Sequence, residues 1–194
     1  MSEFWVFFQI GLYHVLDLHG YDHVLFLIVL TAPYTAQHWK KLLTLVSLFT
    51  LGHTISLLLA VFDLLIIKSS IIEVLILATI LLTGLFNLIN QGKNTKNKQD
   101  IFIWISTLFF GLIHGFGFST YFKGILSGEA IDKLPKLLEF ALGIEAAQII
   151  VVVTVLILAF IMQTLLKFNK RDFTLTLSSF VMGVTVALLL EKFY

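Results

Sequence analysis

Hydrophobic runs long enough to cross a lipid bilayer recur along almost the whole chain, and they constrain its fold more than any other feature. A transmembrane helix needs about 20 mainly apolar residues to span ~30 Å of hydrocarbon. Polar breaks divide the chain into six runs, within residues 4–35 and at about 42–67, 71–89, 101–122, 137–166 and 173–190. Only 13% of the residues are charged, about half the share usual in a soluble domain. The sequence therefore predicts an all-α integral membrane protein.

The linkers between these runs are short, which favours helices that pack beside their neighbours in sequence. We expect a single transmembrane domain over residues 1–194, folded as a compact bundle of about six transmembrane helices. Polar residues 17–23 interrupt the first run, and residues 4–16 are too short to cross alone. We therefore expect the first helix to be broken, or preceded by a short re-entrant helix. An interfacial amphipathic helix before an ordinary span is the alternative.

Basic residues are distributed unevenly between the two sets of linkers. Six crossings place the linkers after the first, third and fifth runs on one side. That side carries eight of the thirteen basic residues: Lys40, Lys41, Lys93, Lys96, Lys98, Lys167, Lys170 and Arg171. The positive-inside rule makes this side cytoplasmic. We expect a multi-pass protein of the inner (cytoplasmic) membrane with both termini outside the cytoplasm. The first residues lack a basic segment and a small-residue cleavage site, so we expect no cleaved signal peptide.

Several ionisable residues fall at similar depth inside the predicted helices. His53 and His114 each lie about 13 residues, or roughly 20 Å, from the cytoplasmic end of their runs. Glu145 lies about 8 residues, or roughly 12 Å, from the outer end of its run. His14 and the polar break at 17–23 fall in the outer half. Four separate runs thus direct ionisable groups toward one outer-to-middle layer.

Ionised groups at the bilayer centre cost at least about 2.5–3.5 kcal/mol, so they are kept where they pair or bind an ion. The chain has no cysteine, so a metal would be held by nitrogen and oxygen, which suits nickel, cobalt, zinc, copper or iron. His14 and Asp17 share a helix face if that turn is helical. Asp22 and His23 are adjacent, so a regular helix would splay them, whereas an unwound segment brings both inward.

Each of these residues also has a purely structural explanation. A lone transmembrane histidine is more often a hydrogen-bonding partner of another helix than a ligand, and Glu145 can pair with other helices through polar contacts, as can Gln148. His38 belongs to a basic loop, and we interpret it as interfacial. The number of histidines at one depth favours a metal site, with seven candidate residues: His14, Asp17, Asp22, His23, His53, His114 and Glu145.

Four sequence motifs occur in the order found in one family of membrane proteins. They are G-x-x-H followed by G-Y-D-H-V-L-F (residues 11–26), F-T-x-x-H-[ST]-x-[ST] (49–56), F-G-L-I-H-G-F-G-F-S (110–119) and G-x-E-x-x-Q (143–148). Together they resemble the HupE/UreJ family over nearly the whole chain. The interval between His14 and Gly20 is longer than in many members, which indicates a divergent branch.

The resemblance implies a secondary permease for nickel or cobalt that uses six of the candidate residues: His14, Asp22, His23, His53, His114 and Glu145. We therefore expect a transporter rather than an enzyme, with a metal ion and the lipid bilayer as partners. No nucleic-acid or nucleotide-binding motif is present, and an oligomer is compatible with the sequence. Two alternatives stay open. One is an intramembrane zinc hydrolase with His14, His53 and His114 as ligands and Asp22 or Glu145 as base; the other is a metal-binding subunit that does not transport.

Overall fold

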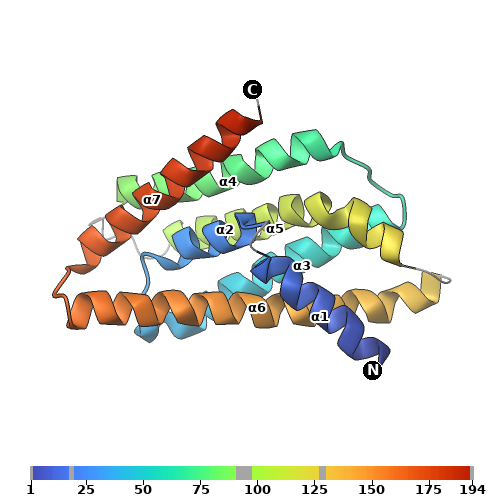
Figure 1. The fold of residues 1–194 in the computed structure, drawn as a ribbon, viewed down its shortest axis with the longest axis horizontal. Helices are drawn as coiled ribbons and strands as arrows, with labels where there is room; N and C mark the ends of the chain where they lie inside the picture. Colours follow the sequence, from blue (N-terminus) through green and yellow to red (C-terminus); the bar gives the residue numbers. More distant parts are fainter. Residues whose placement is uncertain (1, 18–19, 91–97, 127–129, 193–194) are drawn as a thin grey trace.

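The computed structural model describes residues 2–17, 20–90, 98–126 and 130–192, and Figure 1 shows helices along nearly all of them. In chain order they are α1 (Glu3–Leu16), α2 (Asp22–Thr31), the short 3-10 helix η1 (Ala36–His38), α3 (Trp39–Val61), α4 (Ser69–Asn90), α5 (Lys98–Ile125), α6 (Ala130–Thr164) and α7 (Lys170–Glu191). The described residues contain no strand. The predicted all-α class is confirmed.

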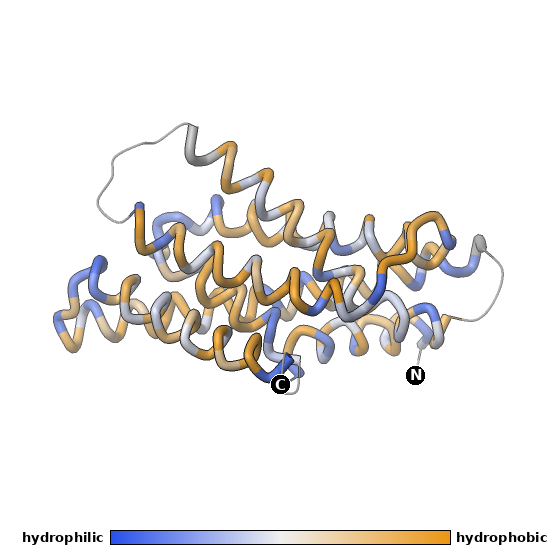
Figure 2. The backbone as a smooth tube through the Cα atoms, turned by 90° about the horizontal axis from the view of Figure 1, so that it is seen from above, coloured by the Kyte–Doolittle hydropathy of each residue, from blue (hydrophilic) through white to orange (hydrophobic). Residues whose placement is uncertain are grey.

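Five helical segments are long and apolar enough to cross a membrane. They are Ala36–Val61, Ser69–Asn90, Ile101–Ile125, Asp132–Thr164 and Lys170–Glu191. Hydrophobic residues run along the length of these helices, and hydrophilic residues gather mostly at their ends (Figure 2). Large apolar side chains such as Phe109, Phe160 and Phe180 are more than half exposed on the outside of the bundle, where lipid tails take the place of water. The chain is a multi-pass helical membrane protein.

The first predicted span is broken, as expected. With 14 residues α1 is about 21 Å long, and with 10 residues α2 is about 15 Å long, so neither crosses ~30 Å of hydrocarbon. The expected position of the break was partly wrong, because α2 already begins at Asp22. Both Asp22 and His23 are therefore helical rather than unwound. His19 lies outside the described residues.

The second span ends earlier than its apolar sequence predicts. We expected it to extend to residue 67, but α3 ends at Val61. The chain turns at Asp63, which has a φ of 56°, and the Asp63 carboxylate pairs with Lys123 of α5. Leu64 and Ile66 are exposed. Their apolar character reflects contact with lipid and not continuation of the helix.

Three helix pairs form the layers of the bundle, with the short α2 between them. The closest pairs are α3 with α5, α1 with α6, and α4 with α7, and α2 contacts α4, α6, α7 and α1. In Figure 1, α4 and α7 lie along one side, α1 and α6 along the other, and α2, α3 and α5 between them. Because α2 is enclosed by protein, Phe26, Leu27 and Val29 are almost fully buried.

Glycines allow two of these pairs to approach at backbone distance. A Cβ atom on Gly52 of α3 would lie 2.2 Å from the Leu108 carbonyl oxygen of α5. A Cβ atom on Gly11 of α1 would lie 2.1 Å from the Phe140 carbonyl oxygen of α6. Small residues at such contacts are typical of helices that associate within a bilayer. They also bring the side chains on the neighbouring helical turns close together.

Candidate metal centre

Three histidines from three different helices meet inside the bundle. His14 of α1, His23 of α2 and His53 of α3 each offer a ring nitrogen, and these atoms lie within 4.8 Å of one another. The ring centroids are 4.7 Å apart for His14 and His23, and 5.6 Å apart for His14 and His53. We call these residues the histidine triad. Residues that lie far apart in sequence are brought to one point by the broken first span and α3.

The local sequence explains why these side chains face inward. His14 comes one helical turn after Gly11, whose close contact with α6 turns that face of α1 toward the bundle. His53 directly follows Gly52, and a Cβ atom on Gly115 of α5 would lie only 2.4 Å from the His53 carbonyl oxygen. His23 lies in the first turn of the buried helix α2. The glycine contacts and the helix start together fix the positions of the triad.

Asp22 holds the imidazole of His23 in a defined orientation. Asp22 Oδ1 accepts the backbone N–H of His23 at 2.8 Å and contacts His23 Nδ1 at 2.9 Å. A carboxylate accepts here, so Nδ1 carries the proton and Nε2 keeps its lone pair. This is the carboxylate–histidine pairing by which proteins commonly orient metal-ligating histidines. We predicted that a regular helix would splay the two residues, but both lie in the first turn of α2 and still contact each other.

His114 of α5 lies beside the triad. Its ring centroid is 5.0 Å from that of His23, and the residue is 1% exposed. Its Nδ1 lies 2.8 Å from the Phe110 carbonyl oxygen. A carbonyl oxygen only accepts, so Nδ1 donates and Nε2 keeps its lone pair. His114 therefore adds a fourth imidazole of defined tautomer next to the other three.

Phenylalanines surround these histidines. The Phe118 ring lies on the imidazole of His14, with centroids 3.8 Å apart, and Phe118 stacks in parallel with Phe140. Phe26 and Phe49 lie 5.4 and 5.0 Å from His114. No sequence motif assigned a role to these phenylalanines. Their presence gives the histidines an apolar surrounding in which electrostatic interactions are strong.

Each of the four histidines has a buried ring nitrogen that lacks a hydrogen-bond partner. Nε2 is buried and without a partner in His14, His23, His53 and His114, and so is Nδ1 of His53. A buried polar atom without a partner costs about 1–3 kcal/mol, and several such atoms at one point are uncommon. Imidazole nitrogens suit divalent nickel, cobalt, copper and zinc. The donor set therefore fits a transition-metal ion.

The two other predicted site residues lie apart from the triad. Asp17 follows the last residue of α1, is exposed, and lines a surface hollow together with His14. The side chain of Glu145 is half-buried in α6, and its Oε1 accepts from Ser47 Oγ at 2.5 Å. Ser47 precedes His53 by six residues, or about 9 Å along the helix. We had expected Glu145 in the same layer as the histidines, and its contact with Ser47 places it one to two turns away along α3.

A second polar contact lies beside that of Glu145. Thr50 Oγ1 donates to Gln148 Oε1 at 2.9 Å, and Gln148 is fully buried. The spacing of three residues on α3 (Ser47 and Thr50) matches that on α6 (Glu145 and Gln148). The sequence analysis gave Ser47 no role. The matched spacing is the sequence signal that could have indicated its contact with Glu145. Glu145 and Gln148 thus make polar contacts with another helix, α3, as their purely structural explanation predicts.

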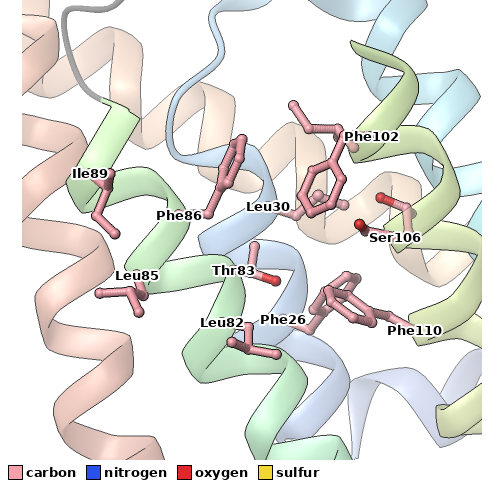
Figure 3. A pocket seen from close by; sticks show the side chains of 12 residues that line it. Phe26, Leu30, Leu82, Thr83, Leu85, Phe86, Ile89, Phe102, Ser106 and Phe110 are labelled. Atoms are coloured by element: carbon pink, nitrogen blue, oxygen red, sulfur yellow. The ribbon is translucent and has the colours of Figure 1, made fainter. Parts of the chain in front are cut away.

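A cavity of about 280 Å³ lies between α2, α4 and α5 (Figure 3). One of its lining residues, Phe26, also contacts the ring of His114. Aliphatic and phenyl side chains form most of its wall. Its polar groups are the hydroxyls of Thr83, Ser106 and Thr107. No residue that lines it carries an imidazole or a carboxylate, so it does not extend the metal centre.

Comparison with known proteins agrees with the sequence motifs. Among curated proteins and solved structures, no match was found. A family model described as HupE / UreJ protein matches residues 1–192, which is almost the whole chain. The chain belongs to the HupE/UreJ family.

Proposed function

We propose that this protein is a secondary permease for a divalent transition-metal ion, nickel or cobalt, in the inner (cytoplasmic) membrane. The observation that carries the proposal is the histidine triad, which brings one ring nitrogen of each histidine within 4.8 Å of the others and leaves buried Nε2 atoms without hydrogen-bond partners inside a membrane protein. Membership in the HupE/UreJ family supports it. A metal ion passing through the bundle is the chemical partner that these nitrogens lack.

Binding at the triad compensates the ion for the loss of its water. Three helices supply one imidazole each, and these imidazoles can replace water ligands when they are neutral. Asp22 contributes a negative charge next to His23, which offsets part of the charge of the dication in an apolar surrounding. His114 offers a further nitrogen beside His23. A site built from adjacent helices in this way exchanges its ligands when the helices shift.

The direction of transport follows from the charge distribution of the linkers. The basic residues put the start of α3 and α5 in the cytoplasm and both termini outside it. The ion then arrives from the side on which the N-terminal end of α1 lies (Figure 1). The sequence carries no nucleotide-binding motif, so transport runs down the ion gradient or is coupled to protons or to the membrane potential.

The test compares His53→Ala with His38→Ala. His38 is exposed, and it contacts Thr35 and the Tyr34 ring, away from the triad, so its variant controls for the loss of a histidine. We expect His53→Ala to lower the affinity for Ni²⁺ or Co²⁺ by at least about 100-fold and to abolish uptake into proteoliposomes, while His38→Ala behaves as wild type. Metal content of the purified protein and radiotracer uptake are the measurements. A folded His53→Ala variant with full metal content and normal uptake contradicts the proposal.

A zinc-dependent hydrolase is the second candidate, and one observation favours it. Three histidines that leave a coordination position open are typical of catalytic zinc sites, and His14 lines an open surface hollow. The two functions differ in their readout. A permease moves metal into sealed proteoliposomes, whereas a hydrolase turns over amide or ester substrates in detergent and moves none. Stable metal binding with neither activity indicates a metal-binding subunit that does not transport.

A further inference from the structure

A hollow of about 930 Å³ opens at the surface between α1 and α5. Its wall carries polar groups spaced along one side of α1 and at the end of α5: Gln9, Tyr13, Asp17 and Tyr121. Asp17 is the only carboxylate among the described residues that line it. The apolar side chains of Val6, Ile10, Leu16 and Phe118 also line the hollow, so its polar groups stand among apolar ones.

The hollow reaches the metal centre through one residue. His14 lines the hollow and is also a member of the triad. It is half-buried, whereas His23 and His53 are 3% and 0% exposed. Phe118 also lines the hollow and lies on the His14 ring. An ion in the hollow therefore meets His14 and the Phe118 ring before it meets the other two histidines.

A second opening lies near the centre but does not reach the triad. This cavity of about 250 Å³ is lined by Tyr21, Asp22, Glu73, Glu191 and Lys192, among others. Its lining carries three carboxylates and one ammonium group, and Lys192 Nζ lies 2.5 Å from Glu73 Oε2. None of the triad histidines lines the cavity, so an ion there does not meet a triad imidazole directly.

We propose that the hollow between α1 and α5 is the route by which a divalent cation reaches the histidine triad, with Asp17 as the first carboxylate on the way and His14 as the first ligand. The proposal rests on metal binding by the triad but does not require transport. It gives a role to Asp17, which lines the hollow but is not one of the three grouped histidines. Asp17 concentrates cations at the mouth of the hollow by long-range attraction rather than by coordination.

The chain contains no cysteine, so single cysteines can be introduced without removing others. Gln9→Cys places a thiol in the hollow, and Tyr21→Cys places one in the second opening. Each purified variant is mixed rapidly with Co²⁺, and the visible absorption of the bound ion gives its association rate before and after a bulky methanethiosulfonate is attached. The unmodified sample is the reference for each variant, and reduction of the mixed disulfide has to restore the original rate.

We expect modification of Gln9→Cys to slow both association and dissociation of Co²⁺ several-fold and to leave the affinity nearly unchanged, because a blocked route changes rates in both directions. Modification of Tyr21→Cys leaves both rates unchanged. Asp17→Asn lowers the association rate about tenfold at low ionic strength, and the effect fades as salt is added. A merely structural role of Asp17 would not produce this salt dependence.

Two results overturn the proposal, and they are distinguishable. If the wild-type protein binds Co²⁺ but modification slows binding only in Tyr21→Cys, the route is wrong and the metal centre stands. If the wild-type protein binds neither Co²⁺ nor Ni²⁺, the proposed metal binding by the triad is contradicted, and so is the proposed route to it.

Discussion

A substitution at the contact between α1 and α6 can displace the predicted metal ligand His14 without changing the histidine itself. A Cβ atom on Gly11 would lie 2.1 Å from the Phe140 carbonyl oxygen and 3.0 Å from the Ile144 nitrogen. The closest ordinary carbon–oxygen contacts are about 3.3 Å, so Gly11→Ala forces the two backbones apart by about 1.2 Å. His14 lies one turn further along α1 and moves with it. Backbone atoms cannot rotate away as a flexible side chain can, so the separation is unavoidable.

Metal sites tolerate this shift poorly. Ligand distances are held to about ±0.2 Å, and disturbing the support of a ligand typically costs 10–100-fold in affinity, roughly the loss we expect for Gly11→Ala. Overpacking also lowers the free energy of unfolding by about 1–3 kcal/mol. The assay is competition for Ni²⁺ or Co²⁺ against a fluorescent chelator in detergent, with thermal unfolding of the same samples.

Gly183→Ala in α7 is the matched control, because a Cβ atom there has no neighbour within 4 Å. Alanine is also the better helix former, so this variant is expected to be as stable as wild type or slightly more stable. Unchanged metal affinity in a folded Gly11→Ala protein would refute the reasoning, since His14 would then not depend on the contact between α1 and α6, or would not bind the metal.

Three further predictions use the same preparations. Asp22→Ala lowers metal affinity about 10–100-fold, because His23 loses the carboxylate that orients it, and Asp22→Asn lowers the affinity less. Equal metal affinity in the wild type and both variants argues against an orienting role of Asp22. Glu145→Gln leaves metal affinity unchanged, since Glu145 contacts Ser47 outside the triad, and a large loss would put Glu145 in the coordination sphere. Asn87 donates to Val29 O and to Ser178 Oγ, so Asn87→Leu lowers the free energy of unfolding by about 1–2 kcal/mol in a detergent titration; no change indicates that these bonds contribute little.

Much of the fold could be predicted because a bilayer leaves few choices. Apolar runs have to become helices where no water satisfies the backbone, so the all-α class and the break in the first span followed from composition and length. The end of α3 did not follow. Leu64 and Ile66 are as apolar as a helix interior, and only the turn at Asp63 and its contact with Lys123 end the helix. No pattern in the sequence indicates that Asp63 and Lys123 meet.

The meeting of the histidines could be predicted in outline from depth alone. Counting residues placed His53 and His114 at one level, and a Cβ atom on Gly115 would meet the His53 backbone across the helix contact. The separation of Glu145 from them could not be predicted, because α6 begins at Ala130, several residues before its apolar run. The helix start shifts every depth counted along that run. Rotation about the helix axis, which turns Glu145 toward Ser47, is also set by packing and not by depth.

The break between α1 and α2 has a consequence for how the protein is made. A helix of about 15 or 21 Å that enters the hydrocarbon leaves one end inside it, and the free carbonyl and N–H groups at that end cannot remain in lipid. The helices α1 and α2 therefore cannot settle one at a time. They require the surface that α3 and α6 provide, although those helices are synthesised later. His14 and His23 thus reach their final positions after His53, and the order in which the metal centre is assembled differs from the order of the sequence.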